Sequence, residues 1–322
     1  PHWSPNSIKI AFVDNGRNLY VLDVASGKVS NVDSDDAYFP GDFRDLFGSW
    51  SKDGMWLAYS KITGTNFERA YIHNVKTGEN KAVSDPLANV TDPTFDASGK
   101  YLYLSVSTDA GPVVNWFQQS SNDMRVTNDV YLLTLQNDEG SPLIRRNDLE
   151  EIPEEEEEKG QDEGEDAGTD EEAEEGSAED DEDEALRIDF DGLETRIVHL
   201  PIGNGNFYNL ESAKDGELLY ISRNDQGSTM HRYSLKDRKD KEFMPASWFE
   251  VTGDGEHLFV GSRGQWGVTS IGNPQAKDLK SPDSYGMKVK IDPVAEWKNI
   301  FYEMWRVNRD YFYDPGMLGV DW

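Results

Sequence analysis

One short motif, a strand followed by a tight turn and a second strand, recurs along the chain and constrains its fold more than any other feature. Its clearest copy is residues 48–60, GSWSKDGMWLAYS, in which strand-forming residues flank the turn KDG. Gly54 can take the positive φ that such a turn requires. Weaker copies lie at residues 3–7, 95–99, 212–216 and 251–255. We therefore expect repeated antiparallel strand units.

The spacing of the turns predicts the architecture. Their last residues are 7, 54, 99, 216 and 255, so successive steps are about 47, 45, 117 and 39 residues. Four-stranded propeller blades repeat about every 40 to 50 residues, which fits every step except one. We predict an all-β fold, a β-propeller of four-stranded blades with about five blades visible. Residues 1–285 would form a partial propeller, because the chain opens inside a blade motif.

The long step contains an acidic insertion. Residues 148–184 carry 23 acidic side chains and one basic residue, Lys159. Such a segment buries too little apolar surface to offset its ordering entropy, so we predict a disordered acidic loop over about residues 137–186. Strand patterns at residues 129–135 before it, and at 187–190 and 195–201 after it, place the loop within the third visible blade.

The charge balance restricts the partners. The net charge is −31, of which about −22 lies in residues 148–184 and about −9 on the rest. A chain without an evident basic face is not expected to bind nucleic acid or an anionic membrane. No apolar run is long enough to span a bilayer. Cysteine is absent, which excludes disulfides and thiolate chemistry.

The pattern changes near the C-terminus. Asp292 and Pro293 provide an N-cap and a first-turn proline, and Trp297, Ile300 and Phe301 follow helical spacing. We predict that residues 286–322 form a linker and an amphipathic helix that ends near residue 314, the start of a truncated catalytic domain. Its aromatic stripe is expected to pack on the propeller or on a further domain.

The sequence carries no recognisable catalytic motif: it has no Gly-x-Ser-x-Gly elbow, no His-Glu-x-x-His and no phosphate-binding loop. We therefore assign no catalytic, cofactor-binding or metal-binding residue. Residues 189–194, DFDGLE, resemble part of a calcium loop, but later ligands are missing and a β-turn accounts for the glycine. Arg223, Asn224 and Arg263 follow strands and are candidate substrate-channel residues that could contact peptide carboxylates, with loop solvation as the simpler interpretation.

The C-terminal residues 296–322, EWKNIFYEMWRVNRDYFYDPGMLGVDW, resemble the entry to the catalytic region of tricorn-type serine peptidases. Residues 188–201 are also similar to a strand region of bacterial members. This resemblance implies two successive propellers and a catalytic domain interrupted by a PDZ-like module, acting without a cofactor on short peptides. The chain would then be most of the second, seven-bladed propeller and the first helix of the catalytic region.

The resemblance also implies partners and a role. The expected partners are peptide substrates and the downstream catalytic and PDZ-like domains of the same chain, in a homo-oligomeric parent. The propeller would admit peptides and position the catalytic domain, while this fragment alone should be inactive. The resemblance implies a cytoplasmic location, and the missing N-terminus leaves periplasmic export open. The alternatives are a TolB-like propeller that binds a protein partner and a propeller fused to an α/β-hydrolase peptidase.

Overall fold

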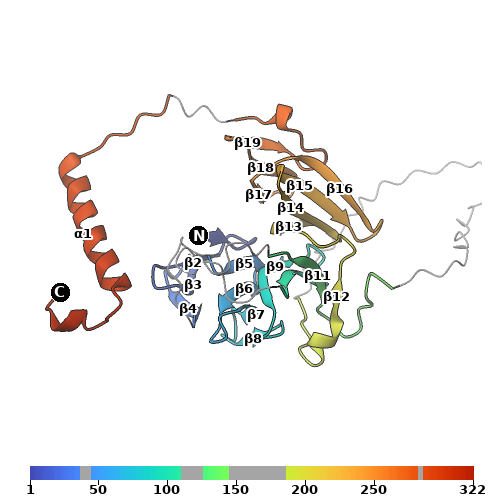
Figure 1. The fold of residues 1–322 in the computed structure, drawn as a ribbon, viewed down its shortest axis with the longest axis horizontal. Helices are drawn as coiled ribbons and strands as arrows, with labels where there is room; N and C mark the ends of the chain where they lie inside the picture. The colour runs from blue at the N-terminus through green and yellow to red at the C-terminus, as the bar shows by residue number, and fades with distance from the viewer. Residues whose placement is uncertain (37–44, 110–125, 145–185, 282–285) are drawn as a thin grey trace, which may run out of the picture.

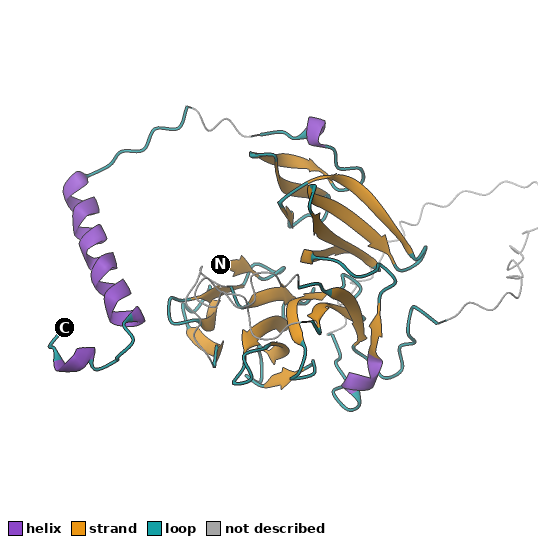
Figure 2. Ribbon diagram, in the orientation of Figure 1, coloured by secondary structure: helices purple, strands orange, loops and turns teal. Residues whose placement is uncertain are grey.

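The computed structural model describes residues 1–36, 45–109, 126–144, 186–281 and 286–322 (Figure 1). It shows five antiparallel sheets arranged one after another as the blades of a propeller, followed by one C-terminal α-helix. The predicted all-β propeller fold is therefore confirmed. Figure 2 shows how strongly strands dominate the blades, with helix confined to short turns and the C-terminal segment.

Within each sheet the strands follow the chain order, so each blade is a β-meander. The first two blades contain β1 (His2–Trp3), β2 (Lys9–Val13), β3 (Asn18–Asp23) and β4 (Val29–Ser34), then β5 (Phe47–Trp50), β6 (Trp56–Ile62), β7 (Glu68–Asn74) and β8 (Asn80–Ala82). The third contains β9 (Asn89–Phe95), β10 (Tyr101–Ser107), β11 (Asp129–Thr134) and β12 (Ile197–His199). The fourth contains β13 (Phe207–Lys214), β14 (Glu217–Asn224), β15 (Gly227–Ser234) and β16 (Lys239–Pro245).

The fifth blade has three strands in the part of the chain that the structure describes. These are β17 (Trp248–Val251), β18 (His257–Ser262) and β19 (Gln265–Ser270). Beside β19, Lys280 forms an isolated antiparallel bridge with Val268. A chain segment thus begins to occupy the position of a fourth strand without extending into one.

Local chemistry explains the turns that define the repeat. In the second blade, the Asp53 carboxylate accepts a hydrogen bond from the backbone N–H of Met55 at 3.0 Å, and Gly54 has a φ of 66°. The fifth blade repeats this geometry, because Asp254 accepts from the N–H of Glu256 at 2.9 Å. An aspartate that bonds the backbone two residues on and a glycine with positive φ are the residues that such turns favour.

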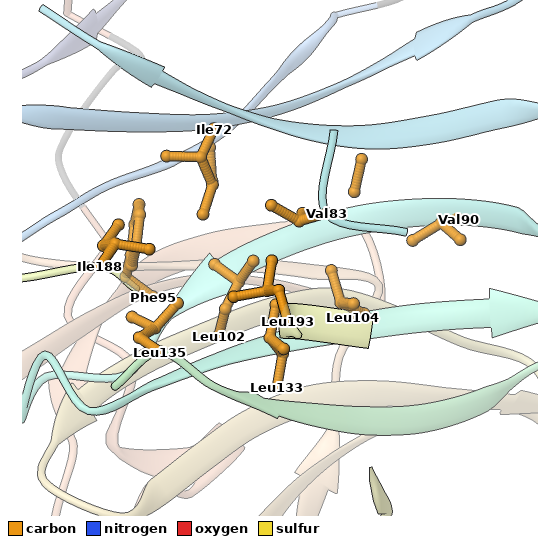
Figure 3. Close-up of a cluster of buried hydrophobic side chains, with 12 residues drawn as sticks. Ile72, Val83, Val90, Phe95, Leu102, Leu104, Leu133, Leu135, Ile188 and Leu193 are labelled. Carbon is orange, nitrogen blue, oxygen red and sulfur yellow. The ribbon is translucent and has the colours of Figure 1, made fainter. Parts of the chain in front are cut away.

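The hydrophobic core lies between consecutive blades. Figure 3 shows the cluster between the second and third blades, where Ile72 and Val83 face Leu102, Leu104 and other buried side chains of the third blade. Alternate residues of each strand supply these side chains, as expected for sheets packed on both faces. Three further clusters of buried residues join the other pairs of neighbouring blades.

The insertion separates two neighbouring strands of one blade. Strands β11 and β12 pair in antiparallel register, with Leu132 opposite Val198, although the acidic residues lie between them in the sequence. Most of the predicted disordered loop lies outside the described residues. The prediction of a strand over residues 187–190 is wrong: this segment is irregular, and a 3-10 helix (Leu193–Arg196) precedes β12. The Asp191-Gly192 turn, where Gly192 has a φ of 68°, redirects the chain and delays the strand.

The predicted C-terminal helix is present as α1 (Pro293–Tyr311). Asp292 caps it by accepting from the N–H groups of Val294 (3.1 Å) and Ala295 (3.3 Å). In Figures 1 and 2 the helix stands apart from the blades, and the Tyr311 hydroxyl donates to the carbonyl oxygen of Asn15 at 2.7 Å. In the described part of the chain, no helix combines the length and apolarity needed to cross a membrane.

Candidate functional site

A polar pocket lies where the third and fourth blades meet. The first strand of each blade is the innermost strand of the propeller, here called the central strand. This follows because β9 contacts both β5 and β13, and β13 also contacts β17, so that the first strands of neighbouring blades lie next to one another. The pocket has a volume of about 300 Å³ and opens beside the beginnings of β9 and β13. Its lining includes Asn89, Thr91, Asp92, Ser107, Asn206 and Tyr208. It is at the lower end of the volume range of small-ligand sites.

A break in strand register shapes the pocket on the β9 side. The pairing of β9 with β10 shifts between Tyr103 and Ser105, and Asp92 has a φ of 49°. A left-handed residue at a bulge re-aims its own side chain and bends the strand. Pro93 follows directly and has no N–H to contribute to the ladder. Asp92 at this bulge is one of the residues that line the pocket.

On the opposite side, a single amide holds the start of β13. Asn128 donates to the carbonyl oxygen of Phe207 at 2.7 Å and accepts from the N–H of Phe207 at 2.7 Å. The same NH2 group also donates to the Ser105 hydroxyl at 2.6 Å. These bonds use the hydrogen-bonding groups of Asn128, so this residue positions the pocket wall and has little capacity left for a ligand.

The next boundary contains the same bulge with a different side chain. Asn209 has a φ of 55° at a register shift in β13, as Asp92 has in β9. Its amide accepts from the N–H of Phe249 at 2.9 Å and donates to the Phe249 carbonyl oxygen at 3.0 Å. Asn209 therefore joins the fourth and fifth blades, whereas between the third and fourth blades the corresponding bonds come from Asn128.

A second carboxyl group of the central strands has an unusual environment. Glu211 on β13 accepts from the N–H of Val251 at 2.7 Å and from the Asn209 amide at 3.3 Å. Burial, aided by the negative charge of Glu250, raises the pKa of Glu211 to about 8. The side chain is half-buried, so solvent moderates this effect. Glu211 thus bridges two blades at a site that disfavours its charged form.

The three predicted channel residues lie at the end of a strand or in a turn at the blade surface. Arg223 and Asn224 end β14, opposite Ser228 and Gly227, and Arg263 has a φ of 51° in the turn between β18 and β19. All three are exposed, and none lines the pocket. The backbone N–H of Arg223 donates to the carbonyl oxygen of Asn206, a pocket residue, at 2.9 Å. Their role as channel contacts stays a prediction.

One sequence feature outside the repeated turns indicates the position of the pocket. Proline is rare inside a central strand, so Asp92-Pro93 within a strand pattern marks a bulge. The partners of that bulge, Asn128 and Asn206, are distant in sequence and carry no local signature. Within the described ranges, no group of three or more metal-ligating side chains comes together, and Asp189 accepts instead from the N–H of Asn137 at 3.0 Å.

Comparison with protein families assigns both parts of the chain. Residues 1–272 match the tricorn protease second beta propeller domain, and residues 293–322 match the tricorn protease C1 domain. The first match covers all five blades, and the second begins at the first residue of α1. The two matches follow the same order as the propeller and the helix in the structure.

Individual relatives agree with this assignment. Tricorn protease homolog 1 of Streptomyces coelicolor is 26% identical over 344 residues, which covers 99% of this chain and 30% of the relative. Putative tricorn protease homolog 2 of the same organism is 28% identical over 160 residues, covering 44% of this chain and 14% of the relative. The chain therefore spans less than a third of the length of these relatives.

The solved structures add evidence on the fold. A crystal structure of the tricorn protease matches with a TM-score of 0.68 at 13% sequence identity, over 97% of this chain and 28% of that chain. At this identity the match concerns the arrangement of the blades. Taken together with the two domain matches, which cover the propeller and the helix, it leads to one conclusion: the chain belongs to the tricorn protease family.

Proposed function

We propose that this chain is the non-catalytic propeller portion of a tricorn-like serine peptidase that degrades short peptides. In this proposal the propeller is both a substrate gate and a scaffold. It admits peptides along its central strands and holds the catalytic region in place. The catalytic residues would lie in other domains, so the chain by itself would hydrolyse nothing.

The exposed apolar side of α1 is the observation that carries the scaffold role. Trp297 and Phe301 are 66% and 68% exposed, and Ile300 and Met304 are also exposed. No residue of the helix is buried. Several large apolar side chains exposed on one helix mark an interaction site, because leaving them in water forfeits the free energy of their burial. The match of this segment to the C1 domain favours the remaining catalytic region as its partner.

The chemistry of the central strands supports the gate role. The beginnings of β9 and β13 carry amides, hydroxyls and a carboxylate around the pocket. Groups of this kind bind the polar main chain of a peptide, which has a donor and an acceptor at nearly every residue. Peptide substrates, a PDZ-like module and identical subunits would then be the partners of the parent protein, with the cytoplasm as the proposed location.

The alternative is a TolB-like propeller that recruits a protein partner. In a propeller that functions only as a binding module, the exposed apolar side of α1 would have no catalytic domain to contact. The two proposals predict different behaviour of α1. In a scaffold its apolar residues determine peptidase activity, and in a binding module they do not.

The test uses the full-length protein that contains this sequence. Phe301→Glu should prevent docking of the catalytic region and lower peptide cleavage by tenfold or more, with unchanged thermal unfolding of the propeller. Lys298→Glu is the matched control, since it places the same charge at another exposed position of the same helix, and it should retain activity. Equal activity of Phe301→Glu and the original protein would contradict the scaffold proposal.

A further inference from the structure

We propose that Asn15, in the turn between β2 and β3, is a site of spontaneous deamidation in the folded protein. Its side-chain amide is converted to a carboxylate, in a mixture of aspartate and isoaspartate. The proposal follows from a comparison of the two Asn-Gly dipeptides of the chain, Asn15-Gly16 and Asn204-Gly205. It does not depend on the peptidase function and assigns a covalent modification to the first blade.

The reaction is an intramolecular attack by the backbone nitrogen that follows an asparagine. This nitrogen loses its proton and bonds to the Cγ atom of the asparagine, and the side-chain NH2 takes up a proton and leaves as ammonia. Solvent water then opens the resulting succinimide ring at either of its two carbonyl carbons, which yields aspartate or isoaspartate. The reacting atoms belong to one chain, so no second molecule has to be brought to them for ring closure. Glycine favours the reaction, because it has no Cβ to hinder the nitrogen and leaves the backbone free to rotate.

The Asn15-Gly16 dipeptide is open to this reaction. Both residues are exposed, in a turn closed by the bond from the N–H of Arg17 to the carbonyl oxygen of Asp14 at 3.0 Å. Among the residues that the structure describes, neither the N–H of Gly16 nor the side-chain amide of Asn15 has a hydrogen-bond partner. The two reacting groups can therefore approach each other without breaking a hydrogen bond of their own.

The end of α1 adds to the reactivity of this turn. The Tyr311 hydroxyl donates to the carbonyl oxygen of Asn15 at 2.7 Å. This carbonyl belongs to the same conjugated peptide unit as the N–H of Gly16. A hydrogen bond to the oxygen polarises the unit, draws electron density from the nitrogen and makes its proton more acidic. Because the attacking nitrogen must be deprotonated, the contact favours deamidation at Asn15.

The second dipeptide is an internal comparison, because hydrogen bonds hold its reacting groups. The N–H of Gly205 donates to the carbonyl oxygen of Asn128 at 3.0 Å, within an isolated antiparallel bridge. The Asn204 side chain donates to the Asp129 carboxylate at 3.3 Å. Both bonds must break before the Gly205 nitrogen can attack the Asn204 side chain. Deamidation of Asn204 therefore requires local opening of the structure.

The two products change the first blade in different ways. Aspartate at position 15 adds a negative charge next to Asp14 and keeps the main-chain carbonyl that accepts from Tyr311. In isoaspartate the chain continues through the side-chain carbonyl, and the former main-chain carbonyl becomes a free carboxylate. The turn is then longer by one methylene group, and the acceptor of the Tyr311 hydroxyl is charged. Deamidation thus alters the contact between the first blade and the end of α1.

The experiment follows deamidation in the full-length protein that contains this sequence. The protein is incubated at neutral pH, both folded and in concentrated urea, and peptides that contain each dipeptide are quantified over time by digestion and mass spectrometry. In the folded protein Asn15 should deamidate about tenfold or more faster than Asn204, because two hydrogen bonds protect the second dipeptide. In urea the two rates should become similar, because neither dipeptide retains its folded environment. Equal rates in the folded protein, or the same difference in urea, would overturn the proposal.

The products and two variants test the chemistry. The peptide that contains residue 15 should yield isoaspartate as well as aspartate, since only a succinimide intermediate gives both. Asn15→Gln keeps the amide but requires a larger and less favourable ring, so it should lose the modification at this position. Asn204→Gln is the matched control and should leave the rate at Asn15 unchanged. Aspartate as the sole product, or an undiminished rate in Asn15→Gln, would contradict the mechanism. The comparison of the two dipeptides in the unmodified protein needs no variant.

Discussion

The amide of Asn209 forms two hydrogen bonds with the backbone of Phe249, accepting from its N–H at 2.9 Å and donating to its carbonyl oxygen at 3.0 Å. One side chain thus extends the backbone pairing of a sheet across the boundary between two blades. Asn128 does the same with Phe207 at the preceding boundary. Blade packing in this chain therefore depends on specific polar bonds between central strands as well as on apolar clusters.

The first prediction concerns this bond pair. Asn209→Ala should lower the free energy of unfolding by about 2 to 4 kcal/mol, because it leaves a donor and an acceptor of Phe249 unsatisfied and places alanine at positive φ. Urea denaturation measures the change. Asn66→Ala is the control, since Asn66 also has a positive φ, 66°, and among the described residues its side chain forms no hydrogen bond to another blade. It should cost about 1 kcal/mol. Equal losses in both variants would contradict the role of the bonds.

The second prediction concerns the Glu211 carboxyl. Its folded-state pKa of about 8 lies above the ordinary value of 4.5, so the folded protein retains a proton that the unfolded chain releases. Stability from this group is therefore present at low pH and is lost as the pH rises from about 4.5 to about 8. Glu211→Gln should be less sensitive than the original protein to a change from pH 6 to pH 9.

The measurement is the difference in unfolding free energy between pH 6 and pH 9 for both proteins, because this range spans the folded-state pKa of Glu211. Glu194→Gln, at an exposed position, serves as a control and should follow the original protein. If Glu211→Gln also follows it, then the Glu211 carboxyl is ionised in the folded state at neutral pH and the assigned environment is wrong.

The third prediction concerns the anchor at the end of the acidic insertion. The Asp53 carboxylate accepts from the N–H of Leu186 at 2.9 Å, and the Trp56 indole N–H donates to the carbonyl oxygen of Leu186 at 3.0 Å. Asp53→Ala should accelerate hydrogen exchange of the Leu186 amide about tenfold or more, since a charge-assisted bond contributes about 1.5 to 3 kcal/mol.

Asp254→Ala is the matched control for that anchor. It removes the aspartate from the corresponding turn of the fifth blade, where the carboxylate's bonds to other described residues lie within its own turn and to His257. Both variants lose turn bonds, so the difference between them isolates the contact with Leu186. Unchanged exchange of the Leu186 amide in Asp53→Ala would show that the anchor is unimportant.

The sequence was sufficient to predict the blades because the information is local. A turn such as Lys52-Asp53-Gly54 is specified by the aspartate that bonds the backbone and by the glycine at positive φ. The C-terminal helix is equally local, since Asp292 caps it directly before Pro293. These elements could be located without knowledge of the rest of the chain.

The pocket could not be predicted in the same way because its geometry depends on contacts between distant residues. Asn128 and Phe207 are 79 positions apart, and nothing near Asn128 indicates this partner. Arg223 is a candidate peptide contact from the sequence, with loop solvation as the simpler interpretation, and it does not line the pocket, whereas Asp92 does. Prediction from sequence favoured charges at strand ends and overlooked a residue inside a strand whose conformation is set by a bulge.

Peptide cleavage by the full-length protein is the most direct test of the central claim. Short fluorogenic peptides would be incubated with that protein, with and without a serine-reactive inhibitor, beside this 322-residue chain. We expect cleavage by the full-length protein that the inhibitor abolishes, and no cleavage by the chain alone. An inert full-length protein across a broad peptide panel, or cleavage by the isolated chain, would contradict a gate and scaffold for a catalytic domain elsewhere.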